Sequence, residues 1–524
     1  MSLDKYSGPW NSEVALHLLR RTSFVPKKSN LDQALLDGMD ATVDKILTPK
    51  TNVEPPLNYA FENDPNVPIG ETWVDAPFSQ TVGLNQYRGA SLAGWIIGQM
   101  VEDSISIEEK MILFWHNHFV VSNIEDPRFL YLNYEMLRTN ALGNFRTFVQ
   151  KVTTDPSMLR FLNGNQNTVE APNENYAREL LELFTLGKGE AVGNGDYTTY
   201  TEDDVQEIAK VLTGWRDVGS NSGTVSISSV FQNFRHDKST KQLSHRFDNV
   251  QISNAGASEY KDLIDIIMEK DEVATFIVRN IYRWFLYYDI TEEIEEKIIE
   301  PLATIFRDSD YEISTVMDTL LRSEHFYDAC HVGALIKSPM DFLLNTISLF
   351  ELPTTVPQLS LRYQYWISLF SAAGSMQMNV YGHPSVAGWK AYYQSPAYYR
   401  VWLNSVTLPL RKSLIDVLWI TGFNLGDMNV KIDPFAVLEW VSEPTDINVI
   451  IEDVSRMLVP RPLNDGQRAY LKGLVLQGLP DFEWTVEYVD YLADPDDPIK
   501  KGAINLKLTV LFYSMCQLPE FQLS

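Results

Sequence analysis

The segment 173–184 carries the most informative polar residues of the chain. Within it, Asn175, Arg178, Glu179 and Glu182 follow one another at i, i+3, i+4 and i+7, which is the spacing of one helix face. Carboxylates one helical turn apart can bind a hard divalent cation, or they can act as an acid and a base. An arginine beside them can hold an anionic group. The spacing therefore indicates hydrolytic or metal-assisted chemistry on this face.

Two interpretations of this segment stay open. If the polar face meets solvent, Glu174–Arg178 and Arg178–Glu182 are ordinary i, i+4 ion pairs that add a few tenths of a kcal/mol. If the face borders a cleft, the same side chains form a site. The residues then expected to contact a ligand are Asn173, Glu174, Asn175 and Arg178. The Asn- and Gly-rich approach to the segment favours the cleft.

A second candidate is the sequence WHNHF at 115–119, which contains His116 and His118. On a continuous helix, residues i and i+2 point about 200° apart, so both imidazoles cannot reach one ion. On an extended segment they would share a side. The alternatives are buried or capping histidines, or a site in which one histidine transfers a proton. In the site interpretation the metal ligands would be His118, Glu179 and Glu182.

A third candidate is the pair His236-Asp237, followed by Lys241. A histidine beside an aspartate offers an oriented imidazole, and the lysine adds a local positive charge. The structural alternative is a loop anchored by side-chain hydrogen bonds.

Several other kinds of site are absent from the sequence. It contains no GxxxxGK[ST], GxSxG, HExxH or EF-hand pattern, which disfavours a P-loop NTPase, an α/β-hydrolase and a zincin. The two cysteines, Cys330 and Cys516, form no CxxC and no Cys/His metal spacing. A zinc finger, an iron–sulfur cluster and a disulfide scaffold are therefore excluded.

These candidates lie mostly in segments with helical periodicity. Ser12 is a plausible N-cap for the first helix, and Ser106 and Thr201 each begin a capping-box pattern before apolar residues at helical spacing. The helix that carries the first candidate is expected to open at Pro172 or Asn173 and to close at Gly187. The prediction is a mainly α protein.

The expected organisation is one large multi-helix core with extensions. Composition and periodicity divide the chain into N-terminal helices (1–47), a long irregular loop (48–87), a central helical core (88–352), an aromatic-rich loop segment (353–400) and a C-terminal helical region (401–524). A Ser-, Asn- and Gly-rich stretch at 216–258 is expected to form one or two short strands.

Composition limits the classes of partner. The chain has 524 residues, of which 45% are apolar and 12% aromatic, so it can bury a large core. Its net charge of −26 should keep it soluble and should repel nucleic acid and anionic lipid. No apolar run approaches the length of a membrane span. We therefore expect neither a nucleic-acid partner nor a membrane segment.

The N-terminus, MSLDKYSGPWNSEV, has no apolar signal core, so the chain as written is expected in the cytoplasm. Ser2-Leu3 could be a cloning scar, and an extracytoplasmic setting therefore stays open if a leader was removed.

The ordered set of motifs resembles the large bacterial family catalogued as domain of unknown function 1800. The resemblance is carried by HLLRRTSF (17–24), FWHNHF (114–119), PSML (156–159), NENYARELLELFTLG (173–187), YTEDDV (200–205), LTGW (212–215), HD with a later K (236–241), KSP (337–339) and VAGW (386–389). Two positions depart from the family pattern, because Val25 and Ser239 stand where the family usually has glycine.

The resemblance implies no established activity, since the family name assigns none. Its genes often neighbour those of a sulfatase-like family, many of whose members carry export signals. A sulfatase-like protein partner and an extracytoplasmic setting are therefore implied by association.

The working hypothesis is a hydrolase-like enzyme. The motifs should converge on one polar cleft with His116 or His118, the acidic helix face, and His236-Asp237. There the carboxylates Glu179 and Glu182 would bind a divalent metal or activate water, a histidine would shuttle the proton, and Arg178 would steady an anionic group of a small-molecule ligand.

The rival hypothesis is a non-catalytic binding or assembly protein, in which the same residues form a structural polar network. The two differ in an observable way. An enzyme needs an open pocket and at least one ionisable group without a protein partner, whereas a scaffold has every such group paired and no cavity beside it.

Overall fold

A computed structural model describes residues 2–50, 52–79, 81–102, 105–353, 356–389 and 398–524. It is mainly helical, which confirms the predicted fold class. The helices of the first half are α1 (Ser12–Thr22), α2 (Lys28–Ile46), α3 (Asn85–Val101), α4 (Glu108–His118), α5 (Pro127–Asn140), α6 (Phe145–Thr153), α7 (Pro156–Phe161), α8 (Asn175–Glu179), α9 (Glu202–Val211) and α10 (Glu259–Met268).

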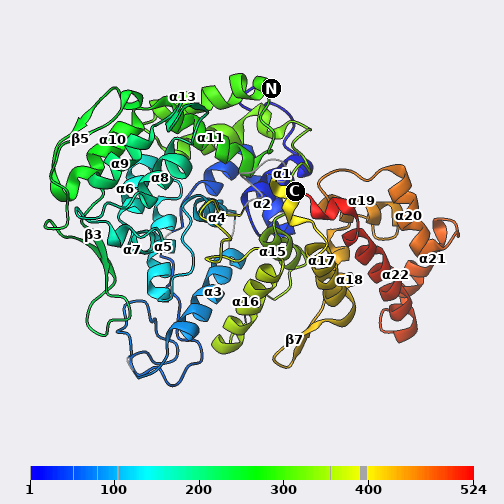
Figure 1. The fold of residues 1–524 in the computed structure, drawn as a ribbon. Helices are drawn as coiled ribbons and strands as arrows, with labels where there is room; N and C mark the ends of the chain where they lie inside the picture. The colour runs from blue at the N-terminus through cyan, green and yellow to red at the C-terminus, as the bar shows by residue number, and fades with distance from the viewer. Residues whose placement is uncertain (1, 51, 80, 103–104, 354–355, 390–397) are drawn as a thin grey trace.

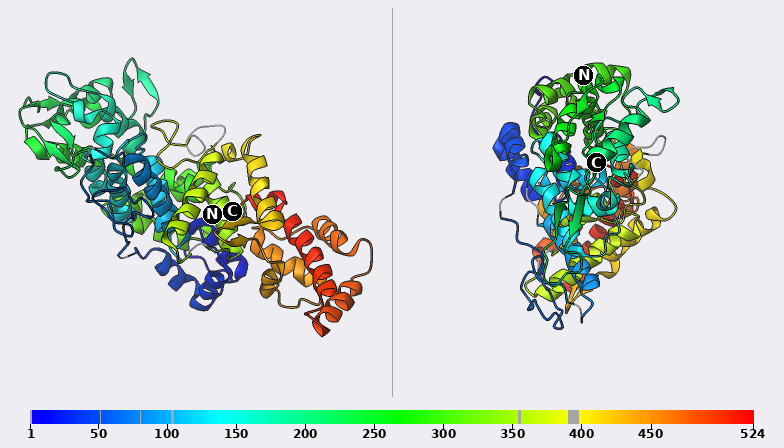
Figure 2. Two further views of the ribbon diagram at one scale, coloured as in Figure 1. Left: turned by 90° about the horizontal axis from the view of Figure 1, so that it is seen from below. Right: turned by 60° about the vertical axis from the view of Figure 1, so that its left-hand side comes forward.

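The second half of the chain is also mainly helical (Figure 1). Its helices are α11 (Asp271–Phe285), α12 (Glu292–Ile294), α13 (Glu300–Asp308), α14 (Ile313–Arg322), α15 (Pro339–Leu349), α16 (Leu359–Ser375), α17 (Thr407–Asp416), α18 (Pro434–Val437), α19 (Ile447–Leu458), α20 (Asp465–Leu476), α21 (Phe482–Ala493) and α22 (Pro498–Cys516). Figure 2 shows an elongated molecule with α19–α22 at one end.

The strands form small antiparallel pairs. Strands β3 (Trp215–Val218) and β4 (Ser228–Phe231) pair with each other, as do β5 (Lys241–Gln242) and β6 (Gln251–Ile252). All four lie at 215–252, where a β excursion was expected. Two further hairpins were not predicted, although Asn194-Gly195 and Gly426-Asp427 are typical two-residue turns: β1 (Ala191–Gly193) with β2 (Asp196–Tyr197), and β7 (Phe423–Leu425) with β8 (Met428–Val430).

Helix α4 is the central element of the fold, and all of its residues are buried. A helix that is buried on every side must find partners for its polar side chains, because a buried polar group without a hydrogen bond costs free energy. Its last residues, His116, Asn117 and His118, are thereby fixed among other elements of the core.

The segment 173–187 is not the continuous α-helix that its spacing predicts. Helix α8 passes directly into a π-helical segment, η2 (Leu180–Thr185), and the chain then turns at Gly187, whose φ is +77°. A π-turn holds more residues than an α-turn, so Glu182 is rotated away from the line through Asn175 and Arg178. The predicted close at Gly187 is confirmed, whereas the single straight polar face is wrong.

Helix starts were predicted with mixed success. The capping box at Thr201 forms, with Asp204 as its second member. The first helix is capped by Asn11 instead of Ser12. The box at Ser106 does not close, because α4 begins two residues later and Ser106 Oγ accepts only from the Glu108 backbone N–H.

The aromatic-rich segment 353–400 is not all loop, and that expectation is corrected by α16. This helix packs along α3 and buries Tyr363, Tyr365 and Trp366. Aromatic side chains at nearby positions of one helix form a packing face, which composition alone does not separate from a loop. Part of the segment, 390–397, lies outside the described residues.

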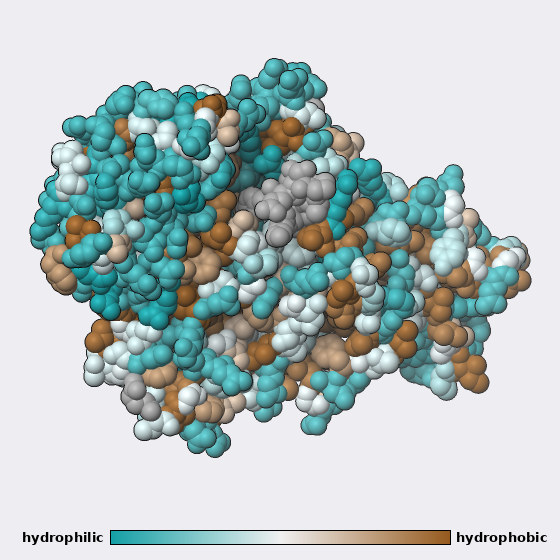
Figure 3. Space-filling model, in the orientation of Figure 1, coloured by the Kyte–Doolittle hydropathy of each residue, from teal (hydrophilic) through white to brown (hydrophobic). Residues whose placement is uncertain are grey.

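The surface is uneven in hydropathy. Figure 3 shows a mainly hydrophilic face over α9, α10 and the neighbouring strands, and more exposed apolar side chains towards the C-terminal helices. The exposed large apolar residues of α21 and α22 include Phe482, Val486, Ile499 and Leu506. Among the described residues, no helix combines the length and the hydropathy that crossing a bilayer requires.

Candidate functional site

The two histidines at the end of α4 point to different neighbours, as positions i and i+2 of a helix must. His116 Nε2 accepts a hydrogen bond from the Tyr381 backbone N–H at 3.1 Å, and its ring lies 4.5 Å from that of His383. Burial and the nearby His383 hold the pKa of His116 well below its usual range. His116 therefore belongs to a buried aromatic cluster.

His118 contacts the π-helical segment instead. Its Nε2 lies 3.0 Å from the carbonyl oxygen of Phe184. A carbonyl only accepts, so Nε2 carries the proton and Nδ1 carries the lone pair. The carbonyls in the last turn of a helix have no partner within the helix, which frees Phe184 for this contact. Burial lowers the pKa of His118 to about 4, so the imidazole is neutral at pH 7.

His118 lines a pocket of about 200 Å³, which we call the His118 pocket. Its polar lining comes from α4, η2, the turn after η2, and α11. The polar residues are Asn117, His118, Glu182, Lys188, Asn280 and Arg283, and the wall is completed by Leu183, Gly187, Phe276, Val386 and Ala387. Segments that lie far apart in the sequence thus meet at one cavity.

Two buried amide groups in this lining have unused hydrogen-bonding capacity. The side-chain Nδ2 atoms of Asn117 and Asn280 have no hydrogen-bond partner among the described residues. Asn117 is held from its other end, because its Oδ1 accepts from the Trp389 backbone N–H at 2.7 Å. A buried donor left unpaired costs about 1–3 kcal/mol, so an oxygen atom that accepted from these groups would be stabilised in the pocket.

The acidic residues of the segment divide between the pocket and the surface. Glu182 lines the pocket and pairs with Lys188, whose Nζ lies 2.6 Å from Oε1. Glu179 makes no hydrogen bond or ion pair with a described residue. Burial, and secondly the negative charge of Glu182, raise the pKa of Glu179.

The neighbouring residues that were expected to bind a ligand form hydrogen bonds and ion pairs with other side chains and the backbone instead. Arg178 donates to both oxygens of Glu202 at 2.8 and 2.7 Å and to Glu174 at 3.2 Å. Asn173 Oδ1 accepts from the Asn175 backbone N–H at 2.9 Å, which stabilises the start of α8. None of these residues is part of the lining of the His118 pocket.

The pair His236-Asp237 lies in a separate, closed network and does not join the His118 pocket, so the expected convergence is wrong for it. His236 Nε2 lies 2.9 Å from Glu259 Oε2, and its Nδ1 lies 2.9 Å from the Thr213 carbonyl. Lys241 Nζ contacts Glu259 Oε1 at 2.5 Å and the Asp237 carbonyl at 2.5 Å. The side chains of His236, Lys241 and Glu259 are fully buried.

The expected metal ligands do not assemble. The ligand atoms of His118, Glu179 and Glu182 do not gather within 4.8 Å of one another. Among the described residues, the His, Cys, Asp and Glu side chains that do so are His325, Asp328 and His331.

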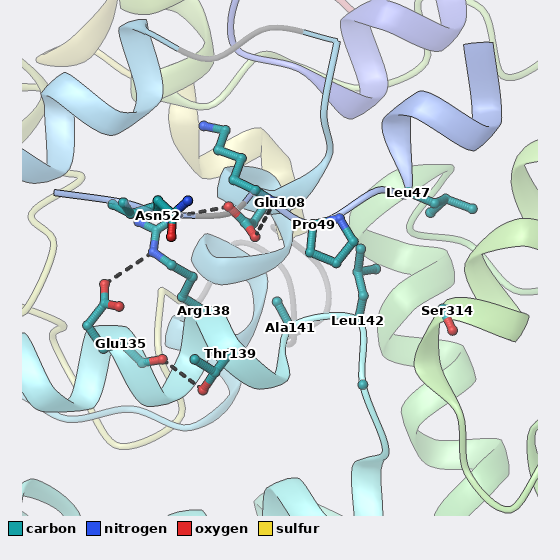
Figure 4. A pocket seen from close by; sticks show the side chains of 13 residues that line it. Leu47, Pro49, Asn52, Glu108, Glu135, Arg138, Thr139, Ala141, Leu142 and Ser314 are labelled. Atoms are coloured by element: carbon teal, nitrogen blue, oxygen red, sulfur yellow. Dashed lines mark hydrogen bonds and ion pairs between the residues drawn. The ribbon is translucent and has the colours of Figure 1, made fainter. Parts of the chain in front are cut away.

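A larger cavity of about 490 Å³ lies beside α4 and α5, and we call it the Arg138 pocket (Figure 4). Arg138 Nη1 contacts Glu108 at 2.9 Å and Glu109 at 2.7 Å, and its Nε contacts Glu135 at 3.2 Å. Burial, as the largest influence, raises the pKa of Glu108 and of Glu135. All three carboxylates are thus engaged by one guanidinium, which favours a structural role.

Sequence reasoning missed several residues of these sites. Asn117 stood between the two noted histidines, so the motif itself could have indicated it. Asn280, Arg283 and Glu259 lie in ordinary amphipathic helices, where one sequence offers no signal that separates a buried polar residue from a surface one.

The sequence profile of the family described as protein of unknown function (DUF1800) matches residues 17–523, which is nearly the whole chain. The chain belongs to this family. No curated protein and no solved structure matches it. Three of the DUF1800-like motifs meet at the His118 pocket: FWHNHF supplies Asn117 and His118, the 173–187 segment supplies Glu182, and VAGW supplies Val386 and Ala387.

Proposed function

We propose that the protein is a hydrolase-like enzyme whose active site is the His118 pocket and whose substrate is a small acyl compound. The observation that supports this most is the coexistence, in one cavity, of an imidazole with a free lone pair and two buried amide donors without partners. These are the groups that hydrolysis by water requires, namely a proton acceptor and oxyanion donors.

The proposed reaction uses water as the nucleophile. His118 Nδ1 takes one proton of the water while its oxygen forms a bond to the carbonyl carbon. The carbonyl oxygen becomes an oxyanion that accepts from Nδ2 of Asn117 and Asn280. When the tetrahedral intermediate collapses, the bond to the leaving group breaks, and His118 returns the proton to that group.

Charge around the pocket favours an anionic or strongly polar substrate. Lys188 and Arg283 line it, and of the two carboxylates nearby only Glu182 is part of the lining. The volume of about 200 Å³ lies below the range of about 300–1,000 Å³ that is common for drug-sized ligands. The ligand is therefore small, or it inserts one end.

The test is hydrolysis of p-nitrophenyl acetate, phosphate and sulfate by the purified full chain and by His118→Gln. The glutamine amide can still donate to the Phe184 carbonyl, but it offers no basic nitrogen. We expect the wild-type protein to hydrolyse the acetate ester, and this rate to fall by about 10²–10⁴-fold in His118→Gln.

The matched control is His245→Gln, which changes an exposed histidine beside Asp196. Turnover of phosphate or sulfate alone would correct the substrate class. No turnover of any ester, or equal rates for His118→Gln and wild type, would overturn the proposal.

A binding or assembly protein is the second candidate function. It is favoured by the His236 network, in which His236 Nε2 and Lys241 both contact Glu259 and His236 Nδ1 contacts the Thr213 carbonyl. None of these residues is part of the lining of the His118 pocket. A sulfatase-like protein is the partner to test, by co-purification of the two full chains. In that case the His118 pocket would bind a ligand without turnover.

A further inference from the structure

The segment 322–336 forms backbone hydrogen bonds with residues near the N-terminus and with the C-terminal residue. Near its start, Ser323 forms a β-bridge with Lys5, and the His325 backbone N–H donates to the Ser2 carbonyl at 3.0 Å. Near its end, the Ser524 backbone N–H donates to the Leu335 carbonyl at 2.9 Å. Between these contacts lies a short turn that contains two histidines and an aspartate.

The two imidazoles of this turn face each other. His325 Nε2 and His331 Nε2 are 3.2 Å apart, and the Tyr282 hydroxyl lies 3.0 Å from the same His325 nitrogen. Asp328 Oδ2 lies 3.0 Å from His325 Nδ1. Both imidazoles are buried, whereas the side chain of Asp328 is 37% exposed, so the cluster can be reached from solvent on the aspartate side.

Assigning the protons shows why a cation fits here. A carboxylate beside Nδ1 fixes the proton on that nitrogen, so His325 Nε2 presents a lone pair. Without a metal, this lone pair accepts from the Tyr282 hydroxyl or from His331 Nε2–H. A metal ion between the two Nε2 atoms would replace these hydrogen bonds with two metal–nitrogen bonds, and His331 would then carry its proton on Nδ1.

The distances agree with the geometry of a metal centre. Imidazole nitrogens bind Zn²⁺ at roughly 2.0–2.1 Å, which places two tetrahedral nitrogen ligands about 3.3 Å apart. A histidine whose far nitrogen is held by a carboxylate is the usual arrangement of a ligating imidazole.

We propose that His325 and His331 bind a divalent transition-metal ion through their Nε2 atoms, with Asp328 orienting His325 through Nδ1 and with Zn²⁺ as the representative ion. One nitrogen or oxygen atom from each of the three residues lies within 4.8 Å of the others. This site is separate from the His118 pocket, because Tyr282 lies on a different face of α11 from Asn280 and Arg283.

The bound ion would stabilise the turn at 325–331, which already contacts helix α1. Arg21 Nη2 already donates to the His331 carbonyl at 2.5 Å, and His17 Nε2 donates to the Phe326 carbonyl at 3.0 Å. These two residues belong to the HLLRRTSF motif, which the His118 pocket does not use. A metal in the turn would thus stabilise the junction of the two chain ends.

The test is equilibrium dialysis of the tag-free, chelator-treated full chain against Zn²⁺, with elemental analysis and the thermal midpoint as readouts. We expect one ion per chain, a higher midpoint with Zn²⁺, and at least about a tenfold loss of affinity in Asp328→Asn and His331→Gln. Co²⁺ should give visible absorption in wild type that Asp328→Asn lacks.

His245→Gln is the matched control, because His245 is an exposed histidine near an aspartate and should leave binding unchanged. Asp328→Asn keeps the experiment decisive if His331→Gln fails to fold, since Asp328 is the most exposed of the three. Binding below one ion per chain, or binding that neither substitution weakens, would overturn the proposal.

Discussion

His118 and His236 are both buried histidines from family motifs, yet the structure uses them in opposite ways. Both nitrogens of His236 have protein partners, and Lys241 Nζ lies 2.5 Å from the other carboxylate oxygen of Glu259. His118 has one partner, lines a cavity, and has two unpartnered amide groups beside it. The two histidines therefore differ in whether unused hydrogen-bonding capacity lies beside them at a cavity, and the proposed function depends on that difference.

A second polar cavity differs in its carboxylates. In the Arg138 pocket, Glu108 and Glu135 contact one guanidinium, which also contacts Glu109 and has one buried donor, Nη2, without a partner among the described residues. In the His118 pocket, Glu182 pairs with Lys188, and the side-chain Nδ2 atoms of Asn117 and Asn280 have no partner among the described residues. The larger volume of the Arg138 pocket therefore does not make it the better candidate.

A substitution in the His236 network should lower the free energy of unfolding strongly. Glu259→Gln removes the charge that faces Lys241 inside the protein, and a buried cation without its partner costs about 3–5 kcal/mol. Denaturant unfolding should show that loss. Glu295→Gln, at the more exposed pair with Arg279, should cost about 1 kcal/mol or less. Equal losses in the two variants would remove the distinction between network and surface pair.

A substitution in the His118 pocket should lower activity strongly and stability little. Asn280→Leu removes an unpartnered buried amide, so the free energy of unfolding should change by less than about 1 kcal/mol or should rise. Ester hydrolysis should fall by about 10²-fold, the usual effect of losing one oxyanion donor. A strongly destabilised variant with unchanged turnover per folded molecule would show that Asn280 is structural.

The pH dependence of stability should separate His118 from the rest of the core. Its pKa falls from 6.5 to about 4 on folding, chiefly through burial. The unfolded chain therefore binds more protons between these values, and stability is lost as the pH falls through 6.5 towards 4. From pH 7 to pH 5 this histidine alone should remove about 2 kcal/mol. His118→Gln should show a correspondingly weaker pH dependence in urea titrations, and an unchanged one would contradict the assignment.

The smallest effect is expected at the exposed end of α8. Arg178 contacts Glu202 and Glu174 outside the pocket, and it is about a third exposed. A double-mutant cycle of Arg178→Gln and Glu202→Gln should give a coupling energy below about 1 kcal/mol. Hydrolysis should stay within a few-fold of wild type. A loss comparable to that of His118→Gln would place Arg178 in the site.

Local patterns predicted much of the fold. The helical class, the strands near 216–258, the capping box at Thr201 and the stop at Gly187 all follow from short-range rules. The π-turn in η2 escaped prediction, because it depends on how Leu186 and Gly187 share the Leu181 carbonyl.

The candidate site was predictable only in its types of residue. The sequence indicated His118 and Glu182, but it could not show that Arg178 pairs outwards with Glu202 or that His236 meets Glu259. Such pairings join residues more than twenty positions apart, so tertiary packing decides them. Asn280 was missed for the same reason, since a buried asparagine on an amphipathic helix has no periodic signal.

The most direct test compares turnover per folded molecule in His118→Gln and Glu259→Gln, with folded fractions measured in the same samples. We expect ester hydrolysis to fall by about 10²-fold or more in His118→Gln and to stay within a few-fold of wild type in Glu259→Gln. Equal turnover in both, or a loss confined to Glu259→Gln, would contradict the assignment of the His118 pocket as the active site.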